Sequence, residues 1–106
     1  MVIEWLRVQV AEDLREVFVQ KDEEIWTAAL AKHSGFLGKE VWISPQNPQE
    51  VILVIHWKTR EAWKSIPQDY LDATEKRFSQ EFDANTYKII EVTEYSVRKF
   101  IQPRSK

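Results

Sequence analysis

The pattern of hydrophobic and polar positions along the chain predicts strands and helices in alternation. Residues 2–10 follow the two-residue period of a strand and carry apolar side chains on both faces. Residues 51–57 form a nearly continuous apolar run rich in β-branched side chains, which is typical of a central strand buried on both faces. Two further strands are expected at residues 39–44 and 87–100.

A long helix is expected between the first two strands. Asp13 begins it, and Glu16 follows three residues later, which is the spacing of a capping box. Apolar residues then recur at helical spacing in two offset stripes, and the charged residues 21–24 are interpreted as the solvated face. The helix is expected to end near His33 and Gly35, because glycine commonly follows the last helical turn.

A second helical region is expected after the central strand. Thr59 is predicted to cap a short helix that contains Trp63. Pro67 interrupts that helix and begins a longer one, which extends to Phe82 with its apolar residues on one face. The remaining segments are predicted to be turns at residues 45–49 and 83–85, and a frayed tail at Gln102 to Lys106.

These elements follow the order β-α-β-β-α-β, which with right-handed crossovers gives the ferredoxin-like α+β sandwich. Its four antiparallel strands carry helices on one face only. The other face would then expose apolar side chains of the first strand, either Val2, Leu6 and Val8 or Ile3 and Trp5. Exposure of so much apolar surface is unfavourable in a monomer, so we expect a homodimer whose two sheets close into an α+β barrel.

Composition narrows the class of protein. The chain has 106 residues, with 15 basic and 17 acidic side chains and a formal net charge of -2, so it lacks a basic field for nucleic acid. It has no cysteine, which excludes disulfides and thiolate chemistry. Neither a signal peptide nor a membrane-spanning apolar run is recognisable. We expect a single domain over residues 1–106, cytoplasmic, without nucleic-acid or membrane partners.

The most specific stretch of the sequence lies between Gly35 and Trp63. It begins Gly-Phe-Leu-Gly-Lys-Glu-Val, and its second strand ends in His56 and Trp57 before Lys-Thr-Arg-Glu-Ala-Trp. These residues resemble the antibiotic-biosynthesis-monooxygenase-like superfamily of dimeric α+β barrels. Within it, the chain is most similar to a small family of uncharacterised proteins found mainly in cyanobacteria. The resemblance implies the same fold and a homodimer.

The resemblance also implies a ligand pocket between the helices and the sheet. Some superfamily members oxidise quinols or polyketide anthrones with O2 and without metal or flavin, and others degrade haem. Haem degraders carry an asparagine on the first strand, a tryptophan near the short helix and a histidine on the following helix. Here the first strand has no asparagine, the tryptophan position falls near Ile66, and residues 67–82 contain no histidine. Haem degradation is therefore not expected.

His56 is the main catalytic candidate. It lies near the end of the central strand and alternates in direction with Trp57. A histidine there could accept a proton from a phenol or quinol, because its pKa lies near neutrality. The alternative is a histidine that is hydrogen-bonded inside the barrel or at the dimer interface.

Aromatic side chains are the candidates for a pocket wall that suits a planar ligand. The expected pocket-lining residues are Trp26, Trp57, Trp63, Tyr70 and Phe78. The same residues at helical spacing are also consistent with ordinary core packing.

Charged residues on the strands are further candidates. Glu4, Arg7, Glu91 and Glu94 could act as acids, bases or ion-pair partners, and the sequence does not orient them. His33 is explained by the favourable position of a cation at a helix end. No metal site is expected, because the histidines lack metal-ligand spacing.

Two functions from different classes remain open. The first is a small-molecule-binding protein, specifically a cofactor-independent monooxygenase for an aromatic or quinol-type compound, with no cofactor. The second is a non-catalytic dimeric module that binds a ligand or a protein partner. Haem binding without degradation is a third and weaker option.

Overall fold

The computed structural model describes residues 1–101 of the 106-residue chain. The frayed tail expected at Gln102 to Lys106 lies outside the described residues. The β-α-β-β-α-β order and the ferredoxin-like α+β fold are both confirmed. No helix in the described part of the chain is long and apolar enough to cross a membrane.

Four antiparallel strands form one sheet in the order β2-β3-β1-β4. Their bounds are β1 (Val2–Val10), β2 (Phe36–Ile43), β3 (Glu50–Trp57) and β4 (Tyr87–Ser96). The predicted bounds of β1 agree with the structure, whereas β2 begins earlier and β4 ends earlier than expected. The central strands β3 and β1 carry most of the buried apolar residues, because both have neighbours on each side.

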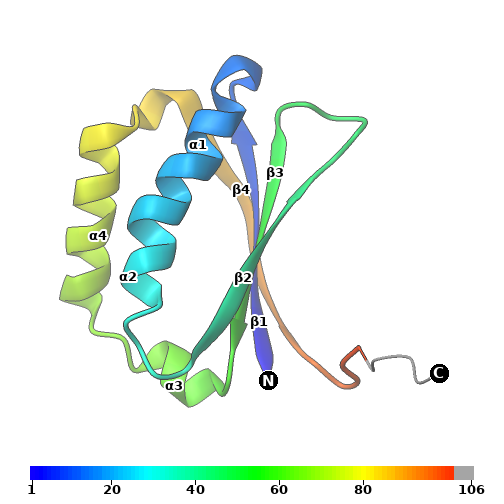
Figure 1. Cartoon of the computed structure of the whole chain (residues 1–106), viewed down its shortest axis with the longest axis vertical. Coiled ribbons are helices and arrows are strands. Elements are labelled where there is room, and N and C mark those ends of the chain that lie inside the picture. The colour runs from blue at the N-terminus through cyan, green and yellow to red at the C-terminus, as the bar shows by residue number, and fades with distance from the viewer. Residues whose placement is uncertain (102–106) are drawn as a thin grey trace.

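The helices cover one face of this sheet and leave the other face open (Figure 1). The first helical region consists of a 3₁₀ turn (Glu12–Leu14), α1 (Arg15–Lys21), a π-helical segment (Asp22–Thr27) and α2 (Ala28–Leu30). The second consists of α3 (Arg60–Lys64), α4 (Gln68–Glu81) and a 3₁₀ turn (Ala84–Thr86). The single long helix expected before Gly35 is thus interrupted by a π-helical segment, a feature that is frequent at functional sites.

The two predicted helix caps differ in outcome. Thr59 caps α3 as expected, since its Oγ1 accepts a hydrogen bond from the Ala62 N–H at 3.0 Å. The capping box at Asp13 is wrong. The chain enters the first helix through a 3₁₀ turn in which the Leu14 N–H donates to the Ala11 carbonyl. Asp13 therefore lies inside the turn and makes no capping hydrogen bond.

Gly35 has a different role from the helix stop that was expected. The helical region ends at Leu30, and Gly35 lies in the following loop, where its carbonyl accepts a hydrogen bond from the Lys58 N–H at 2.8 Å. A Cβ atom at position 35 would lie 2.3 Å from the Cβ of Ala62. Glycine is therefore required for the close approach of this loop to α3.

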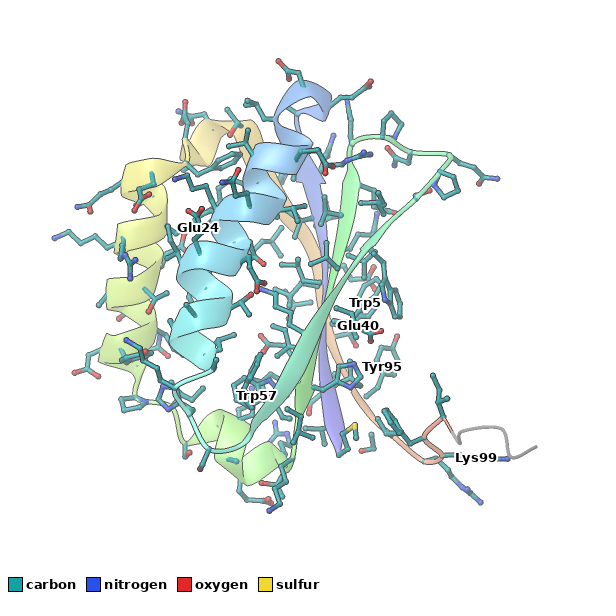
Figure 2. The ribbon with its side chains drawn as sticks, in the orientation of Figure 1. Trp5, Glu24, Glu40, Trp57, Tyr95 and Lys99 are labelled. Atoms are coloured by element: carbon teal, nitrogen blue, oxygen red, sulfur yellow. The ribbon has the colours of Figure 1, made fainter. Side chains whose placement is uncertain are left out.

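The core divides between the two faces of the sheet. The helix-covered face holds the larger part, which includes Val8, Leu53, Ile55, Trp57 and Phe78. The open face holds a smaller buried group of Ile3, Ile52 and Val54, packed with Trp5 and Val97. In Figure 2, Trp5, Glu40 and Tyr95 lie on the side of the sheet away from the helices, and Trp57 lies on the side toward them.

Candidate functional site

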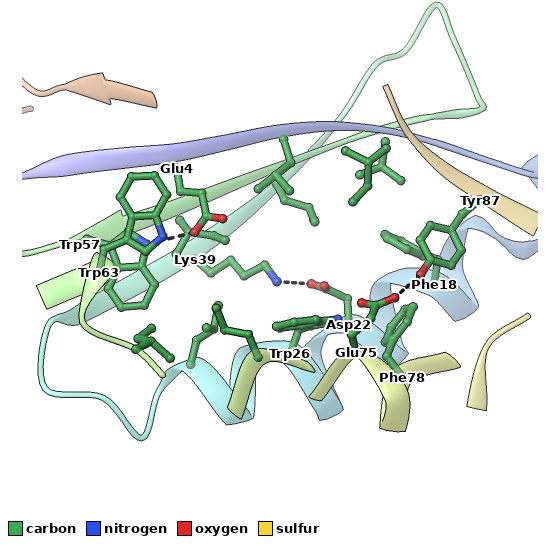
Figure 3. Close-up of a pocket in the computed structure, with 18 residues that line it drawn as sticks. Glu4, Phe18, Asp22, Trp26, Lys39, Trp57, Trp63, Glu75, Phe78 and Tyr87 are labelled. Atoms are coloured by element: carbon green, nitrogen blue, oxygen red, sulfur yellow. Dashed lines mark hydrogen bonds and ion pairs between the residues drawn. The ribbon is translucent and has the colours of Figure 1, made fainter. Parts of the chain in front are cut away.

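A cavity of about 310 Å³ lies between the helical layer and the sheet. Its size falls at the lower end of the range for small-molecule pockets, about 300–1,000 Å³. Most of its wall is aliphatic or aromatic, and five polar side chains interrupt that wall: Glu4, Asp22, Lys39, Glu75 and Tyr87. Together with Trp57, these side chains form three hydrogen-bonded or ion-paired pairs, which Figure 3 shows: Glu4 with Trp57, Lys39 with Asp22, and Tyr87 with Glu75.

The strand register places two of the polar residues in one row across the sheet. Glu4 on β1 and Lys39 on β2 both pair with Ile55 on β3. Residues that pair directly across antiparallel strands point to the same face, so both side chains project toward the helices. With adjacent strands about 4.8 Å apart, the Cα atoms of Glu4 and Lys39 are separated by about 10 Å.

Lys39 forms a buried ion pair with Asp22, which begins the π-helical segment. The Lys39 Nζ lies 2.5 Å from the Asp22 Oδ2, and the two side chains are 2% and 4% exposed. Burial raises the pKa of Asp22, and the nearby Lys39 charge and hydrogen bond oppose that effect. The pair therefore supplies one fixed, desolvated ammonium to the interior of the cavity.

Glu4 is a second carboxyl group in the cavity wall, and it is partly buried. Its Oε1 accepts a hydrogen bond from the indole Nε1–H of Trp57 at 3.2 Å. Burial raises the pKa of Glu4 above its usual value, while the Trp57 hydrogen bond and the charge of Lys39 partly offset this. The Glu4 carboxylate is consequently a stronger base than an exposed glutamate.

Tyr87 and Glu75 form the third pair, at the other end of the cavity (Figure 3). The Tyr87 hydroxyl donates to the Glu75 Oε1 at 3.2 Å. Burial and the neighbouring Glu75 charge raise the pKa of Tyr87 to about 12. Tyr87 therefore stays protonated at neutral pH and serves as a hydrogen-bonding group rather than as a phenolate.

The structure brings most of the expected aromatic residues to the cavity. Trp26, Trp57, Trp63 and Phe78 line it. The indole rings of Trp57 and Trp63 are nearly parallel, at an interplanar angle of 7° and a centroid distance of 6.4 Å. Tyr70 packs elsewhere, where its hydroxyl donates to the Ala29 carbonyl.

Histidines do not contribute to this cavity. His56 pairs with Ile3 in the sheet and lies on the open face, where its Nε2 is 2.8 Å from the Glu40 Oε1. His33 follows α2 and packs edge-on against Tyr70. The structure therefore separates His56 from the tryptophans with which it was grouped, because successive strand residues point to opposite faces.

Of the five polar residues of the cavity, only Glu4 was a candidate in the sequence; Glu75 and Tyr87 were missed, and so were Asp22 and Lys39. The interpretation of residues 21–24 as a solvated face is wrong for Asp22, which is 3% exposed. The spacing of Asp22 and Lys39 from apolar residues did indicate burial. Asp22 lies four residues after Phe18 and three before Ile25, both buried, and Lys39 shares strand parity with Val41.

The chemistry of the cavity does not suit haem. An axial ligand to haem iron is usually histidine, a thiolate, methionine or a tyrosinate. None of the first three lines the cavity, and the hydrogen-bonded Tyr87 resists ionisation. Three carboxyl groups in the wall, from Glu4, Asp22 and Glu75, would also repel carboxylate substituents of the ring. Within residues 1–101, no three His, Cys, Asp or Glu side chains are grouped to hold a metal ion.

A four-stranded antiparallel sheet with helices on one face and a cavity beneath them defines the class of ferredoxin-like α+β domains. The model of one family in this class, described as antibiotic biosynthesis monooxygenase, matches residues 1–68. The match covers more than half of the 106-residue chain, and the chain belongs to this family.

Solved structures share the fold over nearly the whole chain. A Deinococcus radiodurans protein is 18% identical with a TM-score of 0.65, and the alignment covers 99% of this chain and 100% of that one. SnoaB, a cofactor-independent oxygenase from Streptomyces nogalater, is 17% identical with a TM-score of 0.62, covering 96% and 97%. The heme-degrader MhuD from Mycobacterium tuberculosis is 16% identical with a TM-score of 0.68, covering 96% and 100%. These identities establish the fold alone, and no curated protein matches the chain.

Proposed function

We propose that this protein binds a planar aromatic or quinol-type compound in the cavity and oxidises it with O2, without a cofactor. The observation that carries the proposal is an apolar, aromatic-walled cavity that contains a partly buried carboxyl group, Glu4, whose pKa desolvation raises. Apolar pockets with a few converging polar groups and shifted pKa values are typical of active sites. The oxygenase activity of SnoaB, which shares the fold, supports the same reaction class.

Glu4 takes the role of proton acceptor in this proposal, in place of His56. An anthrone-type substrate illustrates the chemistry, because loss of a proton from its ring CH2 gives an electron-rich carbanion. That carbanion reacts with O2, one oxygen atom becomes the new C=O group, and the other leaves with the two hydrogens as water. The ring carbon is oxidised by four electrons and O2 is reduced by four, so no external reductant is required.

The cavity wall would contribute in two ways. Its aromatic rings, including Trp26 and Trp63, offer flat surfaces against which a planar substrate can stack. Exclusion of water from the cavity strengthens the electrostatic interactions of the buried charges with the substrate. Haem oxidation is not part of the proposal, because the lining residues do not fit haem.

The test is oxygen consumption with anthrone and with 1,4-dihydroxynaphthalene, corrected for uncatalysed oxidation, alongside quenching of tryptophan fluorescence. We expect turnover by the wild type and at least a roughly hundredfold loss in Glu4→Gln, the usual contribution of a general base. Glu12→Gln is the matched control, because Glu12 is exposed in the 3₁₀ turn that precedes α1. His56→Ala should retain activity.

The outcomes separate the two classes of function. Fluorescence quenching without oxygen uptake would support a non-catalytic ligand-binding module. Loss of activity in His56→Ala with retention in Glu4→Gln would return the role of proton acceptor to His56. The narrower resemblance to a mainly cyanobacterial family stays a prediction.

We also propose a homodimer that buries the open face of the sheet. Large apolar side chains remain exposed there: Trp42 is 47% exposed and Tyr95 is 57% exposed. Trp42 pairs with Ile52 and Tyr95 with Ile3, so both extend the apolar group on this face. Light scattering after size exclusion should give twice the mass of the 12.6 kDa chain, and Trp42→Glu should give the monomer.

A further inference from the structure

The ammonium group of Lys39 is the central polar feature of the cavity. Its side chain is 2% exposed, and within residues 1–101 Asp22 is its one hydrogen-bonding or ion-pair partner. An ammonium group donates three hydrogen bonds. Lys39 lines the cavity and keeps donor capacity that Asp22 does not use.

Glu4 and Lys39 are placed on either side of the space that a ligand would fill. Both flank Ile55 in the same row of the sheet, and both line the cavity. Figure 3 shows the Lys39 side chain extending along the cavity from the vicinity of Glu4 to Asp22. A single ring system lying over Ile55 would meet a carboxylate on one side and an ammonium on the other.

We propose that Lys39 binds the substrate oxygen on which negative charge develops when Glu4 removes a proton, with Asp22 as the residue that positions Lys39. This inference rests on the proposed function and specifies its substrate class. The substrate carries a hydroxyl or keto oxygen conjugated with its acidic position. A preorganised cation at the site of developing charge is an effective form of transition-state stabilisation.

The charge of the cavity wall restricts the substrate further. Three carboxyl groups, from Glu4, Asp22 and Glu75, face one ammonium, from Lys39. A ligand that enters as an anion meets this excess of carboxyl groups, and repulsion by Asp22 and Glu4 is screened less than repulsion by the exposed Glu75. The substrate is therefore uncharged on binding and becomes anionic only through proton transfer inside the cavity.

The experiment uses 2-hydroxyanthraquinone, a neutral planar phenol whose absorption spectrum changes when the hydroxyl ionises. Its apparent pKa is measured while it is bound to the wild type, to Asp22→Asn and to the double variant Asp22→Asn/Lys39→Met. A cation next to a phenol lowers its pKa by about 1–3 units. We expect the lowest pKa in Asp22→Asn, an intermediate value in the wild type and the highest value in the double variant.

Controls make the result specific to the ion pair. The double variant removes both charges together and so avoids an unpaired buried charge. Lys76→Met removes an exposed lysine of α4 and should leave the bound pKa unchanged. Anthraquinone-2-carboxylate, a permanent anion of similar shape, should bind at least about tenfold more weakly than the phenol.

Each outcome has a defined meaning. Binding of the phenol with the same pKa in all three proteins would overturn the role of Lys39 and leave the proposed function intact. Equal affinity for the carboxylate analogue would overturn the restriction to uncharged substrates. Failure of the wild type to bind either compound would contradict the proposed function and this inference with it.

Discussion

The two faces of the sheet carry similar chemical groups in different environments. On the covered face, Lys39 and Asp22 form an ion pair with side chains 2% and 4% exposed. On the open face, His56 contacts Glu40, whose side chain is 55% exposed. Within a single chain, water screens the second pair more than the first, so the charges of the covered face have the stronger influence on a molecule in the cavity.

This comparison shows why the structure offers a second candidate for the proton acceptor beside the one expected from residue type. Histidine is the usual proton acceptor near neutral pH, and His56 was therefore the natural candidate. The geometry instead places a carboxyl group, Glu4, where burial makes it a stronger base. The choice between the two candidates therefore depends on the environment of each side chain as well as on its ordinary pKa.

Removal of one partner of the buried ion pair should have the largest effect on stability. Lys39→Met leaves the Asp22 carboxylate buried without its counter-ion, and we expect the free energy of unfolding to fall by about 3–5 kcal/mol. Urea denaturation at pH 7 measures this change. Asp22→Asn/Lys39→Met should recover most of the loss, because both charges are then absent.

The open face provides the matched control for that experiment. Glu40→Gln, made in the Trp42→Glu background that is expected to be monomeric, removes the charge of the pair with His56 and should cost less than about 1 kcal/mol. Equal losses in Glu40→Gln and Lys39→Met would contradict the difference between the two faces.

Gly35→Ala should have the next largest effect on the free energy of unfolding, because it disturbs the contact between the loop at Gly35 and α3. The added methyl group would overlap the Cβ of Ala62, which lies on the helix that also carries Trp63. Overpacking of this kind costs about 1–3 kcal/mol, measurable by urea denaturation. The double variant Gly35→Ala/Ala62→Gly removes the overlap and should be more stable than Gly35→Ala alone. Additive losses would show that the close contact is not the cause.

Much of the fold was predictable because its signals are local. The alternation of residues 2–10 gave the bounds of β1, and the hydroxyl of Thr59 marked the start of α3. The capping box at Asp13 failed because a 3₁₀ turn, which the pattern of charges does not encode, precedes α1.

The candidate site was less predictable because it depends on tertiary packing. Strand parity shows that His56 and Trp57 point to opposite faces, but it does not show which face the helices cover. Asp22, which begins the π-helical segment, is buried together with its ion-pair partner Lys39, a residue on another element. Such pairings are visible only after the strands are in register.

The smallest expected effect concerns two glutamates that pair directly across β1 and β4. Burial raises the pKa of Glu4, whereas a hydrogen bond from Arg60 lowers the pKa of Glu94. A carboxyl group with a raised pKa in the folded state destabilises the fold once it ionises, and one with a lowered pKa stabilises the fold once it ionises.

The two glutamine variants should therefore respond to pH in opposite directions. As pH rises from 3 to 7, Glu4→Gln should gain stability relative to the wild type, because it lacks the cost of ionising a buried group. Glu94→Gln should lose relative stability over the same range, because the wild type gains its ion pair with Arg60. Thermal unfolding at a series of pH values measures both trends. If the stability of both variants, relative to the wild type, changed with pH in the same direction, the opposite pKa shifts of Glu4 and Glu94 would be contradicted. The direct pairing of the two glutamates across the strands would then be the better explanation.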